Sequence, residues 1–215
     1  RHTRRRRDAH HPSRAGPPRM NVADGFREAC ANCDLTLSET QLSRALLYFE
    51  LLRKWNRRIS LTSVENDREL IRLHFVEAFW AASHFLEDGL LADIGAGAGF
   101  PGLAAKLYRP ELQVTLIERS FKKCIFLETV ARELDLSVTV VRGSAEHWTQ
   151  WRDVRMAAMR ALQPEAALLA PLEAHSVPLL YFRGPRSTAP AGWHLIREGR
   201  FPLSERRMIS LYRFT

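Results

Sequence analysis

Two acidic residues and a glycine-rich turn are the parts of this sequence best suited to do chemistry. Asp93 follows a short apolar run and precedes four glycines, at positions 95, 97, 99 and 102. Glycine is needed where the backbone takes unusual angles or lies close to a ligand. Glu118 ends the next apolar run, about 20 residues after the turn, where an acid can bind ribose hydroxyls. The pattern predicts a site for a cofactor that contains a nucleoside.

The residues around the turn favour one cofactor over two others. A carboxylate at Asp93, directly before the first glycine, would repel the pyrophosphate of a dinucleotide. The same charge suits the sulfonium and amino groups of S-adenosylmethionine. No lysine follows the glycines as it does in a phosphate-binding loop for ATP. We therefore expect S-adenosylmethionine, with a dinucleotide or a purely structural turn as the alternatives.

The expected cofactor residues lie at the carboxyl ends of successive strands. The loop after the third strand would lie beside the adenine ring, although an ordinary polar loop would look the same in sequence. The full set predicted to bind the cofactor is Asp93, Gly95, Gly97, Gly99, Phe100, Glu118, Ser144, Ala145, Glu146 and Arg160.

From residue 89 onward, apolar strands alternate with helices. Such alternation predicts an α/β fold with a mostly parallel, Rossmann-like sheet and helices on both of its faces. The last two strands, separated by a short loop, suggest a hairpin at one edge of the sheet. The expected strands are 90–94, 112–118, 136–142, 156–160, 177–182, 193–198 and 206–214.

An N-terminal helical cap is expected to precede this sheet. Apolar residues recur at steps of three or four along 38–58, and Ser38 with Gln41 forms a capping box. Weaker helical patterns cover 21–32 and 66–86. The predicted organisation is a tail over 1–19, a helical cap over 20–88 and a catalytic domain over 89–215.

The net charge of +8 is concentrated in the tail. Residues 1–19 contain seven arginines and one aspartate, a charge of +6, which leaves only +2 for residues 20–215. The tail has a disordered composition, and it is either an addition upstream of a true start at Met20 or a basic RNA-binding arm. The remaining charge is therefore weak evidence for a nucleic-acid partner.

Composition and cysteine usage indicate a soluble protein of the cytoplasm. Hydrophobic residues make up 46% of the chain and charged residues 26%, and no apolar run approaches a membrane span. Cys30, Cys33 and Cys124 form no disulfide framework. No second cysteine pair accompanies Cys30 and Cys33, so we expect ordinary thiols and no metal site.

Five ordered segments resemble the RsmG family, also called GidB, of bacterial small-subunit (16S) rRNA guanine-N7 methyltransferases. The resemblance spans roughly residues 35–184. It implies a class I S-adenosylmethionine-dependent methyltransferase fold and methyl transfer to N7 of a guanosine in 16S rRNA. The partner would be 16S rRNA or the small-subunit particle, and the enzyme would be a monomer. The segments are Trp55–Val64, His74–Glu77, Asp93–Gly102, Glu118–Leu127 and Arg160–Ala161.

Four positions depart from the family pattern. The family usually has asparagine where Ser60 stands, arginine where Leu73 stands, aspartate where Glu77 stands and lysine where Arg183 stands. The resemblance implies that these positions belong to the RNA-facing side rather than to the cofactor side. They leave open another RNA, a small-molecule substrate or a catalytically inactive RNA-binding relative.

Methylation at guanine N7 would require no general base, because N7 already carries an exposed lone pair. The enzyme must instead align the two reactants. Arg160 is expected to position guanine O6 or the RNA backbone, and Arg183 to hold phosphate. Arg160 could instead form a structural ion pair. The cations expected to contact RNA, if they are not merely solvated or stabilising a helix terminus, are Lys122, Lys123, Arg53 and Arg57.

Overall fold

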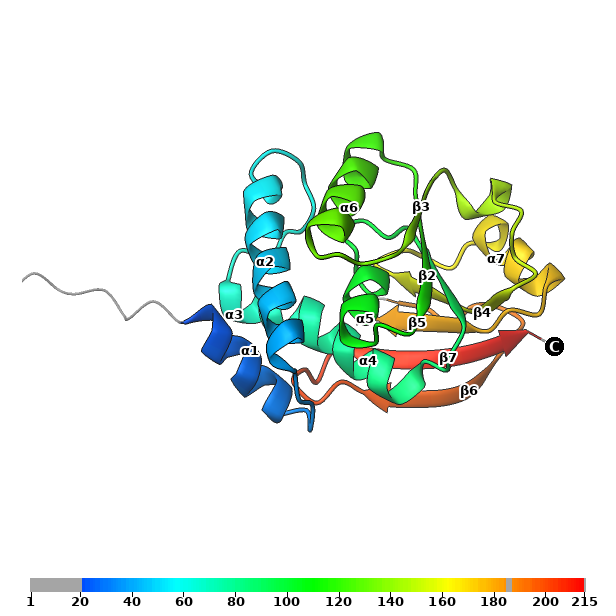
Figure 1. The fold of residues 1–215 in the computed structure, drawn as a ribbon. Coiled ribbons are helices and arrows are strands. Elements are labelled where there is room, and N and C mark those ends of the chain that lie inside the picture. Colours follow the sequence, from blue (N-terminus) through cyan, green and yellow to red (C-terminus); the bar gives the residue numbers. More distant parts are fainter. Residues whose placement is uncertain (1–20, 185–186, 215) are drawn as a thin grey trace, which may run out of the picture.

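The computed structural model describes residues 21–184 and 187–214. The tail predicted over 1–19 lies outside them. The chain begins with a group of helices, drawn in blue to green in Figure 1. These are α1 (Val22–Ala31), α2 (Glu39–Asn56), α3 (Asp67–Leu70), the π-helical turn η1 (Ile71–Val76) and α4 (Glu77–Phe85).

Helix α2 begins as the sequence predicts. The Ser38 hydroxyl accepts from the backbone N–H of Gln41 at 3.2 Å, and the Gln41 side chain accepts from the N–H of Ser38 at 2.7 Å. This capping box satisfies two N–H groups that would otherwise have no partner. The segment 66–86 differs from the expectation, because η1 interrupts it with a wider helical turn.

Among the described residues, seven strands form one sheet in the order β3-β2-β1-β4-β5-β7-β6. The first five pair in parallel, and β7 pairs antiparallel with both β5 and β6. The mostly parallel, Rossmann-like sheet and the edge hairpin are thus confirmed. The strands are β1 (Leu90–Ile94), β2 (Gln113–Glu118), β3 (Thr139–Arg142), β4 (Val154–Arg160), β5 (Leu179–Arg183), β6 (Trp193–Arg200) and β7 (Met208–Phe214).

The third strand is shorter than expected because the first residues of the apolar run belong to the turn that ends the preceding helix. Asp135 takes a positive φ of 51°, and the N–H of Leu136 donates to the carbonyl of Ala131 at 2.9 Å. These contacts close the C-terminus of the helix. Leu136 therefore packs beneath that helix, and the strand begins only at Thr139.

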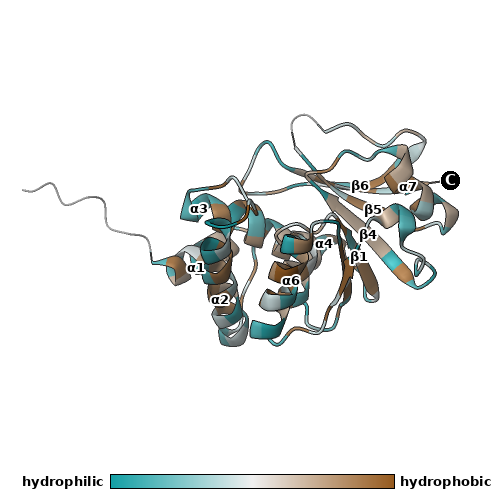
Figure 2. Cartoon of the chain, turned by 90° about the horizontal axis from the view of Figure 1, so that it is seen from above, coloured by the Kyte–Doolittle hydropathy of each residue, from teal (hydrophilic) through white to brown (hydrophobic). Residues whose placement is uncertain are grey.

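Helices cover both faces of the sheet. Helix α4 and helix α6 (Phe121–Glu133) lie on one side and α7 (Ala166–Ala174) lies on the other, as Figure 2 shows from above. The strands between them are largely apolar, and β1, β2, β4 and β5 are almost completely buried. The short helix α5 (Gly102–Tyr108) follows the glycine turn and packs against α4 and β2.

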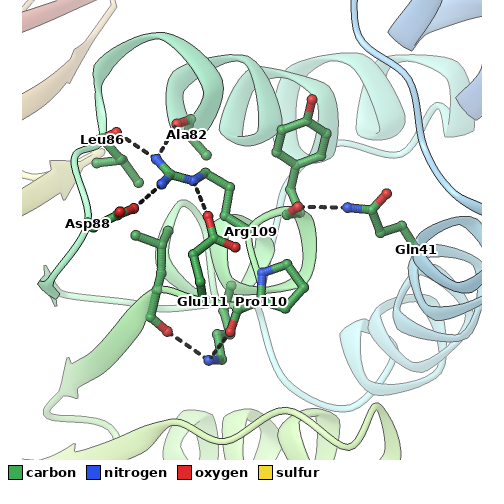
Figure 3. A network of polar contacts seen from close by, with 10 residues as sticks. Gln41, Ala82, Leu86, Asp88, Arg109, Pro110 and Glu111 are labelled. Atoms are coloured by element: carbon green, nitrogen blue, oxygen red, sulfur yellow. Dashed lines mark hydrogen bonds and ion pairs between the residues drawn. The ribbon is translucent and has the colours of Figure 1, made fainter.

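A polar network joins the N-terminal helices to the segment that precedes β2 (Figure 3). The Arg109 guanidinium donates to the carbonyl of Leu86 at 2.6 Å and pairs with Asp88 at 2.5 Å and Glu111 at 2.6 Å. Nearby, the Gln41 amide donates to the carbonyl of Tyr108 at 2.7 Å. The network fixes α2 and the end of α4 against the segment that enters β2.

No helix among residues 21–184 and 187–214 is long and apolar enough to cross a membrane. The three cysteines are buried, and burial raises the pKa of Cys30 to about 12 and that of Cys33 to about 11. Both thiols are therefore protonated at neutral pH, unlike the reactive thiolates of redox sites.

Candidate functional site

A cavity of about 520 Å³ lies at the carboxyl ends of β1, β2, β3 and β4. The strand order reverses between β1 and β4, and ligands of open α/β sheets bind at such a switch point. The residues predicted for the site that line this cavity are Gly95, Gly97, Phe100, Glu118, Lys123, Ser144, Ala145 and Arg160.

The glycine turn and Glu118 are hydrogen-bonded to each other at the carboxyl ends of β1 and β2. Gly97 takes a φ of +58°, and its N–H donates to Oε2 of Glu118 at 2.9 Å. The N–H of Ser120 donates to Oε1 at 2.8 Å. A carboxylate has about four acceptor positions, so each oxygen can accept a further hydrogen bond from a ligand. Glu118 therefore suits a pair of ribose hydroxyls.

Asp93 does not line this cavity. It is 1% exposed and lies beneath the turn, where Oδ2 accepts from the N–H of Gly102, the first residue of α5, at 2.8 Å. Burial raises the pKa of Asp93 to about 7, although the hydrogen bond from Gly102 opposes the shift. The side chain fixes the start of α5, so the structure places it to shape the turn rather than to contact a sulfonium directly.

Tyr48 of the cap supports the turn from the other side. Its ring stacks on Phe100 with centroids 5.3 Å apart, and its hydroxyl donates to the carbonyl of Ala98 at 2.5 Å. A Cβ added at Gly99 would lie 2.2 Å from that hydroxyl, so only glycine fits there. Helix α2 therefore sets the shape of the glycine turn directly.

Replacing Tyr48 by phenylalanine is expected to weaken cofactor binding by about 5- to 10-fold, because one buried hydrogen bond contributes roughly 1 kcal/mol. Calorimetric titration with S-adenosylhomocysteine checks the value. Tyr108→Phe, in the same cap interface but outside the cavity lining, is the matched control. Equal affinities of the parent and Tyr48→Phe would show that the turn needs no support from α2.

Arg160, at the end of β4, lies in a buried cluster of charges. Its guanidinium is 3.0 Å from Glu77 and donates to the carbonyl of Leu73. The side chains of Arg160 and Glu77 are 8% and 1% exposed, respectively. Arg207, which precedes β7, is 4.0 Å from the same carboxylate. The ion pair that was the alternative for Arg160 is therefore present, and Arg160 also lines the cavity.

His74 joins this cluster to the segment that follows α2. Its Nε2 lies 2.8 Å from Oγ1 of Thr62, and its Nδ1 lies 3.3 Å from the Arg160 guanidinium. Burial, together with the nearby positive charge of Arg160, lowers the pKa of His74 to about 2. The imidazole is therefore neutral at physiological pH, with both nitrogens in contact with neighbours.

Because the His74 imidazole is buried and neutral, we expect the protein to lose stability in acid. A histidine whose folded pKa lies below its unfolded value of about 6.5 stabilises the fold above that value, and the contribution is lost as pH falls. Between pH 7.5 and 5.0 the parent should lose about 2 kcal/mol that a His74→Gln variant keeps. Urea unfolding of both proteins at the two pH values measures this difference. His175→Gln, at an exposed position, should show no such change, and parallel curves for His74→Gln would contradict the prediction.

Several residues predicted for the site lie elsewhere. Gly99 packs on Tyr48, and neither Glu146 nor Lys122 lines the cavity. Arg183 pairs with Glu198 at 3.1 Å.

The two basic residues predicted on α2 also lie outside the cavity. Arg57 is exposed at the C-terminus of α2. Arg53 pairs with Asp67 and donates to the carbonyls of Val64 at 3.0 Å and Glu65 at 2.5 Å. Arg53 thus holds the segment after α2, which forms one wall of the cavity, instead of presenting its charge to solvent.

Other residues line the cavity without having been predicted there. Arg207 comes from the turn before β7, almost 90 residues after Glu118 in sequence, and no local motif marks it. The segment after α2 could have been assigned, because it belongs to the resemblance already noted. The lining residues not predicted for the site are Leu61, Thr62, Ser63, Val64, His74, Ile94, Ala96, Ala98, Ile117, Arg119, Gly143, Ala161, Leu162, Leu168 and Arg207.

Comparison with known proteins adds a family. The family model described as rRNA small subunit methyltransferase G, GidB, matches residues 41–177. A relative named Ribosomal RNA small subunit methyltransferase G from Roseiflexus castenholzii is 38% identical over 167 residues, covering 74% of this chain and 68% of the relative. A relative of the same name from Bacillus subtilis is 36% identical over 139 residues, covering 63% of this chain. The chain spans 58% of the length of that Bacillus relative.

Solved structures agree with the fold. A mitomycin 7-O-methyltransferase superimposes with a TM-score of 0.58 and 14% identity, covering 78% of this chain and 60% of that chain. The protein MtNAS, solved with MTA and tNA, gives a TM-score of 0.55 and 13% identity, covering 90% of this chain and 86% of that chain. At these identities the likeness concerns the fold alone, and it supports the predicted class I methyltransferase architecture. With the family match over residues 41–177, the chain belongs to the GidB family, described as rRNA small subunit methyltransferase G.

Proposed function

We propose that this chain transfers the methyl group of S-adenosylmethionine to N7 of a guanosine in 16S rRNA. The observation that carries the proposal is the cavity at the switch point, with the Glu118 carboxylate at the end of β2 and the glycine turn at the end of β1. Family membership supports the rRNA substrate and the small-subunit particle as partner.

The lining of the cavity fits S-adenosylmethionine. Glu118 would accept the ribose hydroxyls, and Gly95 and Gly97 allow the cofactor to lie close to the backbone. The 3₁₀ turn η2 (Ala145–His147) brings Ala145 to the wall, where it would lie against the adenine ring with Ile117. When bound, the cofactor supplies an electrophilic methyl group on a sulfonium.

The polar groups near the cavity also fit an acceptor that needs no deprotonation. His74 is neutral, and both of its nitrogens already contact Thr62 and Arg160. Arg160 stays paired with Glu77 and cannot act as a base. The chain's contribution is therefore to orient the reactants and exclude water, as N7 chemistry requires.

The cofactor assignment is tested by calorimetric titration with three ligands. S-adenosylmethionine and S-adenosylhomocysteine should both bind, and NAD should not. Because Asp93 lies beneath the turn instead of facing the ligand, selectivity against NAD should come from the shape of the cavity. Binding of NAD in place of S-adenosylhomocysteine would contradict the assignment.

The rRNA substrate is tested in cells that lack this modification. Expression of the chain should restore 7-methylguanosine in the small-subunit rRNA, whereas a Glu118→Gln variant should not. Methylated nucleoside found only in another RNA would identify a different substrate. Absence of methylation together with retained RNA binding would identify an inactive relative.

A further inference from the structure

A second cavity of about 550 Å³ adjoins the cofactor cavity. Ala161 and Arg207 line both, so the two spaces meet between the tip of β4 and the turn before β7. Leu73 and Phe182 give the second cavity apolar surface, while Glu69 on α3 and the two guanidiniums of Arg206 and Arg207 give it charge of both signs. The second cavity therefore combines apolar surface with one carboxylate and two guanidinium groups.

We propose that this second cavity holds the guanine base that is methylated, with Arg207 at its N7 and O6 edge and Glu69 at its Watson–Crick edge. The inference rests on the proposed function and names the residues that would recognise its substrate.

The position of each residue follows from the chemistry of guanine. N7 and O6 are neighbouring acceptors on one edge of the ring, whereas N1–H and the 2-amino group are donors on the opposite side. N7 must face the cofactor cavity, so the Watson–Crick edge faces the remaining wall. Arg207 lines both cavities and is thus beside the N7 and O6 edge. Glu69 lines only the second cavity.

Arg207 is better suited than Arg160 to donate to O6. Arg160 is buried and held by Glu77 and the carbonyl of Leu73. Arg207 keeps a 28% exposed side chain, and its only ion pair within residues 21–184 and 187–214 is with Glu77 at 4.0 Å. Glu77 can therefore hold Arg160 in place while Arg207 contacts the base. This assignment moves the O6 contact predicted for Arg160 to its neighbour.

Glu69 supplies the carboxylate that the Watson–Crick edge of guanine requires. Asn66 caps α3 by accepting from the N–H of Glu69 at 3.0 Å, which fixes the backbone of this residue. The side chain is exposed to the cavity and forms no ion pair within the described part of the chain. A carboxylate can accept from N1–H and the 2-amino group of guanine together. Adenine presents an unprotonated N1 there, and the carboxylate would repel it.

The carboxylate would also favour the reaction itself. The N7 lone pair forms the new N–CH₃ bond while the C–S bond of the methyl donor breaks with its electron pair on sulfur, so no proton is released. Positive charge passes from the sulfonium to the guanine ring, which makes N1–H a stronger donor. A negative charge beside N1–H therefore binds the transition state more tightly than the ground state, which raises kcat.

The test compares Glu69→Gln with Glu65→Gln, an exposed carboxylate four residues earlier that lines neither cavity. With small-subunit particles as substrate, Glu69→Gln should lower kcat by about 10- to 100-fold, as expected for one hydrogen bond to a charged group. Binding of S-adenosylhomocysteine should stay at the parent value, which shows that the variant folds. Glu65→Gln should match the parent in both measurements.

A binding experiment separates this inference from the proposed function. In the presence of S-adenosylhomocysteine, the product fragment 7-methylguanosine 5′-monophosphate, whose base is positively charged, should bind the parent more tightly than adenosine 5′-monophosphate, and Glu69→Gln should lose that preference. A Glu69→Gln variant that matches the parent in kcat and in this preference would overturn the inference. A parent that shows the preference but does not methylate small-subunit rRNA would contradict the proposed function and leave the base site supported.

Discussion

Replacing Glu118 by glutamine is expected to weaken binding of S-adenosylmethionine by about 100-fold or more. The carboxylate already accepts from the N–H groups of Gly97 at 2.9 Å and Ser120 at 2.8 Å, and it would accept the ribose hydroxyls as well. An amide has one acceptor oxygen in place of two, so at least one donor loses its partner. Each hydrogen bond to a charged group contributes about 1.5–3 kcal/mol. Calorimetric titration of the parent and the variant measures the loss.

The matched control for Glu118→Gln is Glu128→Gln on α6. Glu128 is exposed and lies outside the cavity lining, so its variant should bind the cofactor as the parent does. Unfolding curves of both variants should show that the folds are intact. If Glu118→Gln bound S-adenosylmethionine as tightly as Glu128→Gln, the cofactor site would not be at the end of β2.

Replacing Glu77 by alanine is expected to lower the free energy of unfolding by about 3–5 kcal/mol. The variant leaves the Arg160 guanidinium buried without its carboxylate partner, which lies 3.0 Å away in the parent. Loss of the carboxylate that pairs with a buried charge is far more costly than loss of an exposed pair. Urea unfolding at pH 7.5 measures the change.

The chain provides its own control for Glu77→Ala. Glu87 pairs with Arg155 at 2.8 Å, but both side chains are about two-thirds exposed, at 66% and 64%. Glu87→Ala should therefore cost less than about 1 kcal/mol. Similar losses for the two variants would mean that burial of Arg160 has no energetic consequence, which would contradict the account of the cluster.

The parts of the site that could be predicted from sequence are those that local pattern determines. The glycine turn and Glu118 lie at the ends of neighbouring parallel strands, so their spacing along the chain fixes their proximity in space. The capping box of α2 was predictable because Ser38 and Gln41 are three residues apart. The alternation of strands and helices likewise predicted the parallel sheet.

The remaining parts depend on packing between distant segments. Asp93 has the sequence position of a cofactor ligand, but it is buried, and its carboxylate accepts from the N–H of Gly102 at the start of α5. Arg160 meets His74 across 86 residues of sequence, and no periodicity predicts that contact. The sequence predicted that Arg53, near the end of a helix, contacts RNA. In the folded protein Arg53 instead forms an ion pair with Asp67, which follows α2.

The second cavity is the least predictable part. Glu69, Ala161 and Arg207 come from the cap, the tip of β4 and the turn before β7, and they share one cavity only because the sheet brings these segments together. Arg72 of η1 positions the turn before β7 by donating to the carbonyl of Leu203. The N-terminal helices thus contribute to both cavities, because Tyr48 supports the glycine turn at the first and Glu69 lines the second.

The most direct test of the central claim is nucleoside analysis of rRNA methylated in vitro. The purified chain would be incubated with S-adenosylmethionine labelled in its methyl group and with small-subunit particles from cells that lack the modification, and the rRNA would be digested and analysed by mass spectrometry. We expect the label in 7-methylguanosine, and none when Glu118→Gln replaces the parent. Label in any other nucleoside, or no label from a parent that binds S-adenosylmethionine, would contradict the account.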